Sequence, residues 1–572
     1  MSQAPASDLD TFLALRDTFF ARYLETQPEE ATTLGLHHLD DRLKDLSASA
    51  LADEHALHQD TLARLERLPP ELLPREARLD RRAMLDVARF HVHVHEARQG
   101  LRGNLELSTY PHAMLQYQIG QAETAGDWAA IASRVARVPT FLQQQERLLA
   151  EGLALDQGPD AHVLRDLTED ALPVIIRYYE HLPALPGAHE VALSTADTRA
   201  LHHAARAARE AFAAHLRFLQ ERVRPHARPS VVLGEEEYRW RLRHVFGLEA
   251  PLEALVLQAR EALAEAQHAI GQLSGALARE VPGAPSSLPH LGEARALLAR
   301  LEEAHPARDE DVIPLYRELI GRAEHFIHEH ALFHVPEGLR LGLKPLPPGM
   351  VDVRGTNWPA PLLDARKPGW FVLAPMAAAH PTVWAALLAV HEAIPGHFLQ
   401  SAAWQRRFGE HPAPVRFLLV TDHVAMARGH FGPLLNIEGY ATYAEERMRR
   451  AGFFTAPEAL TALVARALRA VRVVVDVGLH TGALDEEEAV QHLIQYAYMP
   501  EPNARREVLR FKRIPMQAIT YLLGALEFER LEAELRRERG PRFDEPAFHE
   551  ALFSFGPVPP GQVRQLMREE AG

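Results

Sequence analysis

The sequence predicts a mainly α-helical protein with a small β-sheet set among long packed helices. Apolar side chains recur at three- and four-residue steps along most of the chain, which is the pattern of amphipathic helices. Short β-prone runs are concentrated in one stretch, residues 333–376. A chain of 572 residues is too long for a single hydrophobic core, so we expect two or more substructures.

The first 230 residues are expected to form a helical region. Apolar residues from Leu9 to Tyr23 lie on one face of a first helix. Further helices are expected in Ala-, Leu-, Arg- and Glu-rich segments at residues 126–152, 161–181, 196–224, 252–280 and 292–304. Pro225, Pro229 and Gly234 interrupt this pattern around a short β-like run at 231–233, and we place a domain boundary there, between 1–230 and 231–572.

The second region holds the expected sheet. Its β-prone runs lie between Pro and Gly clusters, at residues 333–335, 339–343, 350–353 and 370–373. After residue 376 the helical pattern returns and continues to about residue 538, and an irregular tail is expected beyond it.

Composition excludes several classes of protein. A net charge of −15 argues against a nucleic-acid partner, because phosphate binding needs a basic face. The chain has no cysteine, so any metal must be held by His, Asp or Glu. No apolar run approaches the length of a membrane span, and residues 1–10 lack the basic and apolar regions of a signal peptide. We therefore expect a cytoplasmic protein without a membrane partner; its oligomeric state stays open.

The most informative segment is 391–397, His-Glu-Ala-Ile-Pro-Gly-His. The usual helical zinc motif has its two histidines four residues apart, on one helix face. His391 and His397 are six apart, or about 240° net around a regular helix, so they cannot converge unless the helix breaks or bulges. Pro395 lacks the N–H that a helix needs, and Gly396 can adopt angles closed to other residues. These two residues therefore predict a break directly before Pro395 that brings the imidazoles together.

The motif, followed by Gln400, resembles the signature of the bacterial "domain of unknown function 885" family, which is considered related to the gluzincin metallopeptidases. Gluzincins take a third ligand from a glutamate on a downstream helix. The segment 438–445, Glu-Gly-Tyr-Ala-Thr-Tyr-Ala-Glu, is similar to the family's E-G-W-A-x-Y-A-E. The resemblance implies a gluzincin-like architecture in which His391, His397 and Glu438 bind one zinc ion per chain. Glu445, two turns after Glu438, is expected to support a ligand histidine.

Two more segments resemble family motifs. One is 472–480, Arg-Val-Val-Val-Asp-Val-Gly-Leu-His; the other combines 507–511 with 515–524, Pro-Met-Gln-Ala-Ile-Thr-Tyr-Leu-Leu-Gly. The resemblance spans most of the chain. Tyr440 replaces the usual Trp and Met516 the usual Gly, so substrate specificity does not carry over.

Several residues in these segments have two interpretations. His480 and Asp476 could stabilise an oxyanion and orient a ligand imidazole, or could form a buried pair in the core. Tyr521 could supply a catalytic hydroxyl, or pack in the core. Arg510, which falls in a family motif, could bind a substrate carboxylate, whereas a solvated basic face is expected for Arg506 and Arg513. Gln517 lies in the same motif as a candidate substrate contact.

Together these observations predict a zinc hydrolase, most plausibly a peptidase acting on short peptides. Residues 231–572 would be the catalytic region, with the metal-binding helices in 383–538. Glu392 would act as general base toward a metal-activated water. The ligands favour zinc, although manganese or cobalt could substitute. Two alternatives stay open: a zinc hydrolase of non-peptide amides or esters, and a metal-free helical binding protein whose site has decayed.

Overall fold

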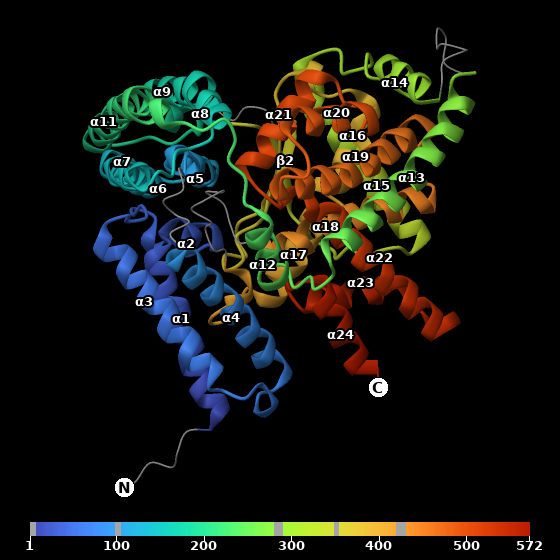
Figure 1. Cartoon of the computed structure of the whole chain (residues 1–572), viewed down its shortest axis with the longest axis horizontal. Helices are drawn as coiled ribbons and strands as arrows, with labels where there is room; N and C mark the ends of the chain where they lie inside the picture. Colours follow the sequence, from blue (N-terminus) through green and yellow to red (C-terminus); the bar gives the residue numbers. More distant parts are fainter. Residues whose placement is uncertain (1–6, 98–103, 280–289, 348–353, 419–430, 572) are drawn as a thin grey trace.

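The computed structural model describes residues 7–97, 104–279, 290–347, 354–418 and 431–571. Within these ranges the chain is mainly helical with one small sheet, as the sequence predicts (Figure 1). The helices are α1 (Asp8–Thr26), α2 (Pro28–Leu34), α3 (Ala48–Glu66), α4 (Arg75–Glu96), α5 (Tyr110–Gly120), α6 (Ala125–Val135), α7 (Val138–Ala154), α8 (Ala161–Asp166), α9 (Leu172–His181), α10 (Leu185–Ala188), α11 (Thr195–Phe218), α12 (Glu235–His244), α13 (Leu252–Leu277), α14 (His290–Leu301), α15 (Val312–His330), α16 (Thr382–Glu392), α17 (His397–Phe408), α18 (Phe431–Ala451), α19 (Ala456–Thr481), α20 (Glu486–Tyr496), α21 (Glu501–Arg513), α22 (Thr520–Arg539), α23 (Glu545–Ser554) and α24 (Pro560–Ala571).

The sheet has three strands in the order β1-β3-β2: β1 (Leu341–Pro345), β2 (Gly355–Trp358) and β3 (Gly369–Leu373). β1 pairs with β3 in parallel and β2 pairs with β3 antiparallel, so β2 is an edge strand among the described residues. The runs at 339–343 and 370–373 overlap β1 and β3. The run at 333–335 is not a strand, and the run at 350–353 lies outside the described residues.

The expected helices are present, with interruptions. The segment 126–152 divides into α6 and α7, because Pro139 fits the first turn of a new helix and not the middle of an old one. The segment 161–181 contains a π-helical turn, Leu167–Ala171, between α8 and α9. The prediction of an irregular tail after about residue 538 is wrong. α23 and α24 follow α22 there, and they bury Phe548, Leu552 and Val563 in the main core.

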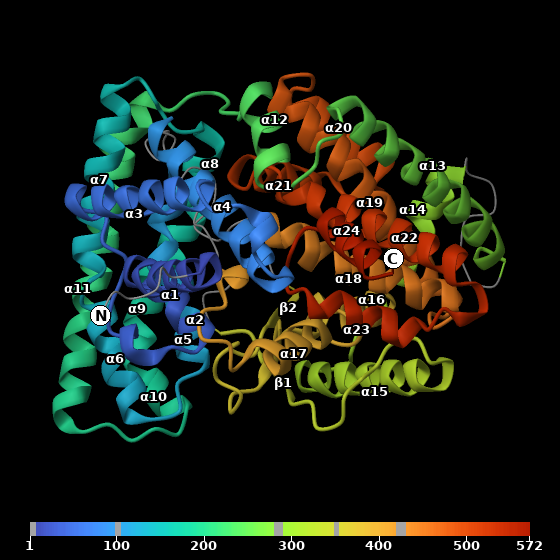
Figure 2. The same ribbon diagram turned by 90° about the horizontal axis from the view of Figure 1, so that it is seen from below.

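Buried side chains form two large cores that do not follow the predicted division at residue 230. The main core joins α1–α4 to elements of the second half, as Phe19 and Leu85 belong to it together with Tyr238, Val390 and Phe528. A second core is formed chiefly by α5–α11, which lie together at one side of the molecule in two views (Figures 1 and 2). The first four helices therefore pack with the region that carries the candidate site.

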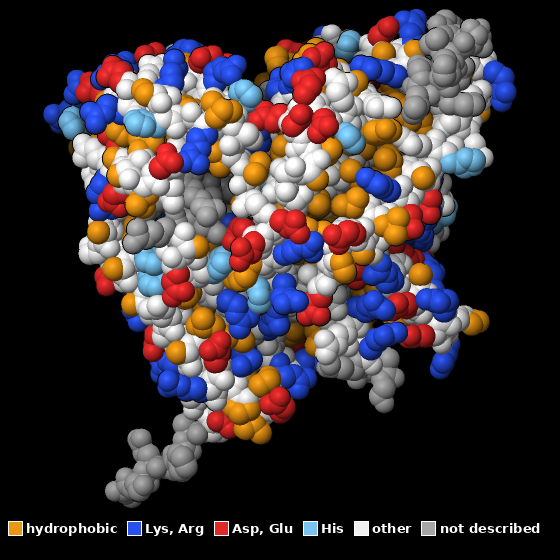
Figure 3. Space-filling model, viewed as in Figure 1, with side chains coloured by type: hydrophobic (Ala, Val, Ile, Leu, Met, Phe, Trp, Pro, Cys, Tyr) orange, Lys and Arg blue, Asp and Glu red, His pale blue; other side chains and the backbone are white. Residues whose placement is uncertain are grey.

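One face of the molecule carries charges of both signs. On the side shown in Figure 3, acidic and basic side chains are intermixed, with hydrophobic side chains scattered between them. Within the described part of the chain, no helix has both the length and the hydropathy needed to cross a membrane.

Candidate metal centre

The helix breaks inside the His-Glu motif, as predicted, but two residues earlier. α16 ends at Glu392 and α17 begins at His397. Gly396 donates its N–H to the Val390 carbonyl at 2.9 Å. A Cβ on Gly396 would lie 1.9 Å from the carbonyl oxygen of His391, so only glycine fits this close approach. The glycine is thus needed for space and not for a left-handed backbone, because its φ is −74°.

The break brings the three predicted ligands together. His391 from α16, His397 from α17 and Glu438 from α18 each offer a ligand atom, and these atoms lie within 4.8 Å of one another. The Nε2 atoms of His391 and His397 are 3.4 and 3.3 Å from the same carboxylate oxygen, Oε2 of Glu438. That oxygen is buried and has no hydrogen-bond partner among the described residues. Two imidazole nitrogens and one carboxylate oxygen facing one point match the donor set of a catalytic zinc site.

Glu445 contacts the His391 imidazole at the nitrogen that faces away from Glu438. Its Oε1 lies 2.6 Å from Nδ1 of His391, which leaves Nε2 directed at Glu438. Arg469 of α19 donates two hydrogen bonds to the same carboxylate, at 2.5 and 2.7 Å. A carboxylate at the far nitrogen fixes the orientation and tautomer of a ligand histidine.

Burial and opposite charge shape the electrostatics of the cluster. Burial lowers the pKa of His391, but the carboxylates of Glu438 and Glu445 outweigh it and raise that pKa to about 10. Burial raises the pKa of Glu438, but the two facing imidazoles hold it well below its usual range. The pKa of Glu392 is raised, chiefly by burial. The cluster therefore combines a negatively charged ligand with a neighbouring carboxyl of increased basicity.

Glu392 lies beside the cluster in a cavity of about 670 Å³. Its Oε2 accepts a hydrogen bond from the backbone N–H of Asn357 in edge strand β2, at 2.7 Å. The cavity is lined by residues of α2, α5, β2, α16, α17, α18 and α22. This volume is within the range of small-molecule sites.

Tyr521 of α22 also lines the cavity, with its ring stacked at 6.3 Å from that of His391. Its hydroxyl accepts a hydrogen bond from Nε2 of Gln517 at 3.0 Å. The Gln517 carbonyl is in turn held by Arg510, and Arg510 pairs with Glu507 at 2.8 Å. Burial is the main cause that raises the pKa of Tyr521, to about 12, so the hydroxyl keeps its proton at neutral pH.

The structure places Arg510 outside the cavity, and not at the substrate-binding position that the sequence suggested. It does not line the cavity; it contacts Glu507 and Gln517 and thereby holds Tyr521. Gln517 does not line the cavity either. Its side-chain amide donates to the Tyr521 hydroxyl and orients it.

Two glycines let α18 and α22 cross closely enough to bring Glu438 and Tyr521 to one cavity. A Cβ on Gly439 would lie 2.5 Å from Cα of Gly524. A Cβ on Gly524 would lie 2.0 Å from the carbonyl oxygen of Leu435. Larger side chains at either position would push the helices apart.

His480 and Asp476 lie outside the cluster and are buried in the core, which agrees with the second of their two interpretations. His480 is fully buried, and its nitrogens face the Phe511 carbonyl at 3.0 Å and the backbone N–H of Leu233 at 3.4 Å. Asp476 accepts hydrogen bonds from the Tyr238 hydroxyl at 2.7 Å and the Met516 N–H at 3.1 Å. Both side chains tie α19 to neighbouring segments, and neither lines the cavity.

The sequence did not predict that the first half of the chain contributes to the walls of the cavity. Gln27, at the N-terminal cap of α2, Glu30 of α2, and Tyr110 and Gln116 of α5 line the cavity. No local motif marks them, because they reach the site only through the tertiary fold. Arg469 was also missed, although it lies one helical turn before Arg472 of a family motif.

The fold and the site together define a mainly helical protein with a candidate His-His-Glu metal centre in a cavity between its two halves. Residues 28–567 match the profile of the bacterial proteins of unknown function called DUF885, and the chain belongs to this family. No curated protein matches the sequence.

Two solved structures share the fold. One, from Shewanella oneidensis, is described as a candidate lipoprotein of unknown function; it is 18% identical with a TM-score of 0.71, over 97% of this chain and 99% of that one. The other, a candidate lipoprotein from Colwellia psychrerythraea, is 17% identical with a TM-score of 0.81, over 99% of both chains. At these identities the likeness concerns the fold alone.

Proposed function

We propose that the protein is a zinc-dependent hydrolase that cleaves amide bonds of short peptides. The observation that carries the proposal is the convergence of His391, His397 and Glu438 on one point, with Glu392 beside them in the same cavity. A buried carboxylate oxygen without a hydrogen-bond partner is costly, and a cation at that point would satisfy it. The gluzincin-like relationship is part of this proposal.

The residues present fit zinc. Imidazole and carboxylate ligands suit zinc, and three protein ligands leave a position for water or substrate. Zinc held there would supply Lewis acidity, which makes a water more acidic and polarises a carbonyl group.

Glu392 would carry the proton. It accepts a proton from the attacking water as the water oxygen bonds to the carbonyl carbon of the scissile amide. When the carbon–nitrogen bond breaks, Glu392 passes that proton to the leaving nitrogen, and a carboxylic acid and an amine result. Burial raises the pKa of Glu392, and a carboxyl with a raised pKa suits both steps, since it accepts the proton from water and later gives it to the leaving nitrogen.

Tyr521 would stabilise the oxyanion that forms on the carbonyl oxygen. The hydroxyl oxygen already accepts from Gln517, so its hydrogen is available to donate into the cavity. The contacts from Glu507 through Arg510 to Gln517 hold this donor in place before substrate arrives, which is the condition for effective electrostatic stabilisation.

Edge strand β2 in the wall of the cavity favours a peptide as the substrate. Residues Gly355–Trp358 line the cavity, and an edge strand can pair with an extended peptide backbone. Hydrolysis of non-peptide amides or esters would use the same groups. A substrate screen distinguishes this alternative from peptide hydrolysis. The retained base Glu392 argues against the third alternative, a binding protein with a decayed site.

The cytoplasmic location expected from the sequence stays a prediction. Two proteins of similar fold are described as candidate lipoproteins. Cell fractionation followed by detection of this protein distinguishes a cytoplasmic from a membrane-attached location.

The proposal is tested with Glu392→Gln and a screen of short peptides. We expect the purified wild type to bind zinc at this centre and to hydrolyse at least one peptide. The variant should keep that zinc and lose about 10²- to 10⁴-fold in kcat. The exposed glutamate Glu318 of α15 provides a matched control, Glu318→Gln, with unchanged turnover. Full activity in Glu392→Gln, or a wild type that binds no zinc when zinc is supplied, would refute the proposal.

A further inference from the structure

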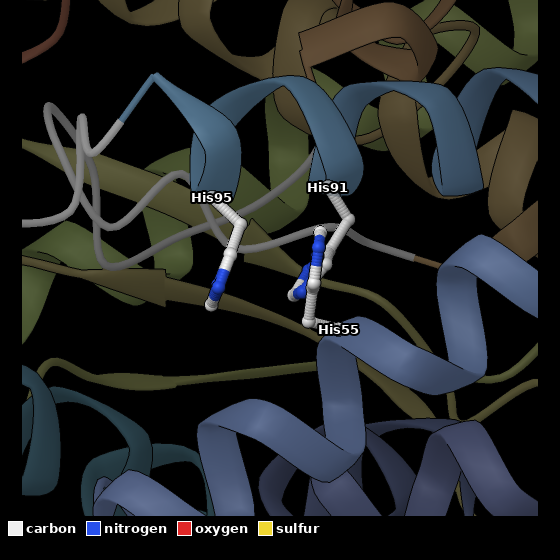
Figure 4. Close-up of side chains that lie close together, drawn as sticks. All are labelled: His55, His91 and His95. Atoms are coloured by element: carbon white, nitrogen blue, oxygen red, sulfur yellow. The ribbon is translucent and has the colours of Figure 1, made fainter.

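Four histidines gather between α3 and α4, apart from the cavity. His55 and His58 project from α3, and His91 and His95 from α4. The ring centroids of His55 and His95 are 3.8 Å apart, and those of His58 and His91 are 4.0 Å apart. Figure 4 shows His91 and His95 extending from one helix toward His55 on the other. None of the four lines the cavity that holds Glu392.

Three of these imidazoles have the spacing of metal ligands. His55, His91 and His95 each offer a nitrogen, and these nitrogens lie within 4.8 Å of one another. His91 and His95 are four residues apart on one helix face, which is the spacing of two histidine ligands in helical zinc motifs. The third ligand comes from the facing helix, so an ion here would join α3 to α4.

Buried nitrogens at the cluster lack partners among the described residues. They include Nδ1 of His55, Nε2 of His91 and both ring nitrogens of His58. The His58 side chain is fully buried, and that of His91 is 11% exposed. Folded proteins satisfy nearly all buried polar atoms, so several unpartnered nitrogens in one place point to a ligand.

A carboxylate also lies near His91, at a longer distance than that of Glu445 from His391. Oε1 of Glu54 lies 3.9 Å from Nδ1 of His91, while Nε2 of that imidazole is the atom without a partner. Glu54 itself is fixed by Lys44 at 2.9 Å and by Gln27 at 2.6 Å. Glu54 therefore places a negative charge beside the cluster, which favours a cation there.

An ion can reach the cluster from solvent. His95 is exposed and His55 is half-buried, whereas His58 is closed off behind them against Phe19 and Tyr23 of α1. The cluster is thus open on one side and packed into the main core on the other.

We propose that His55, His91 and His95 form a second metal site, which binds zinc or a similar borderline transition-metal ion between α3 and α4. The all-imidazole ligand set suits zinc, copper, nickel and cobalt and disfavours magnesium and calcium. The ion would clamp the two helices together. Because Gln27 both bonds Glu54 and lines the cavity, the clamp would also steady one cavity wall.

The test compares zinc binding by the full-length wild type and by His55→Asn/His95→Asn. Chelator-treated proteins are dialysed against zinc chloride, and bound zinc is measured by mass spectrometry. We expect the double variant to hold one zinc fewer per chain than the wild type. Both proteins carry the same candidate centre at His391, His397 and Glu438. The difference in zinc content between them therefore does not depend on whether that centre binds zinc.

A single variant and a control complete the design. His95→Asn removes only an exposed ligand, leaves the packing intact, and should weaken zinc binding at this site at least about tenfold. The exposed His181 at the end of α9 gives the matched control His181→Asn, with wild-type binding. Zinc should also raise the Tm of the wild type more than that of the double variant. Equal zinc content and affinity in the wild type and both cluster variants would overturn the proposal.

Discussion

Glu445 links the candidate metal centre to a charged residue of the helix behind it. Its carboxylate contacts Nδ1 of His391 and receives two hydrogen bonds from Arg469. In the proposed centre it would orient the imidazole toward the metal without being a ligand itself.

Replacing Glu445 should weaken zinc binding without removing it. Glu445→Gln keeps the shape of the side chain but loses the charge that orients His391, and we expect zinc affinity to fall about 10- to 100-fold. Competition with a chromophoric chelator measures this, and excess zinc should restore turnover. Glu446→Gln is the control, because Glu446 pairs with Arg449 and Arg450 outside the cluster. Unchanged affinity in Glu445→Gln would show that this carboxylate does not support a metal ligand.

At the residue scale, sequence reasoning succeeded where spacing carries the information. The six-residue step between the histidines requires a broken helix, and the break is present. For Asp476 and His480 the sequence left two interpretations open, because an i, i+4 pair does not reveal which neighbours surround it. Their partners, Tyr238 and Phe511, come from segments far away in the sequence.

The elements around the site are held by close contacts that the sequence encodes only indirectly. Gly439 and Gly524 permit the close crossing of α18 and α22, and both occur in motifs of the family. Strand β2 was not predicted, because Gly-Thr-Asn-Trp is short and polar and pairs only when β3 lies beside it. The helices α23 and α24 were missed because their stability comes from burying side chains in the main core.

Asp476 gives the junction of α19 with α12 and with the segment before α22 a predictable pH dependence. Burial raises its pKa to about 7, although hydrogen bonds from Tyr238 and Met516 and the charge of Arg510 oppose this. The folded chain therefore favours the protonated carboxyl, whereas the unfolded chain titrates near its ordinary pKa of about 3.9. The stability from this group is present below pH about 4 and is lost as the pH rises to about 7.

Asp476→Asn, a neutral side chain of the same shape, should remove that dependence. The difference in unfolding free energy between variant and wild type should grow by up to ~1.4 kcal/mol per pH unit between pH 5 and 7, in favour of the variant. Thermal or denaturant unfolding at the two pH values measures it. The control is Asp60→Asn, whose side chain is 59% exposed. An equal difference at both pH values would mean that Asp476 is ionised in the folded protein throughout.

At the scale of the whole molecule, the cavity exists because the two halves of the chain meet. α2 and α5 form one wall, and β2, α16, α17, α18 and α22 form the others. Composition and periodicity predict the helices and the small sheet, but not that α1–α4 share a core with the second half. Contacts between elements hundreds of residues apart leave no local pattern in one sequence.

The walled cavity should restrict the size of the substrate. A volume of about 670 Å³ accommodates a short peptide but not a folded domain. We expect a tryptic digest of lysozyme, freed of trypsin, to be hydrolysed at a rate at least an order of magnitude above that of intact folded lysozyme, as measured by the release of new amino groups. Equal rates on both would contradict a walled site.

The central claim is that His391, His397 and Glu438 bind zinc, and anomalous X-ray diffraction at the zinc edge tests it directly. Crystals grown with zinc should show an anomalous peak between the three side chains, with ligand distances of about 2.0–2.2 Å. Data collected below the edge should lose that peak, which identifies the metal. Crystals that contain zinc in solution but show no peak at this point would contradict the account.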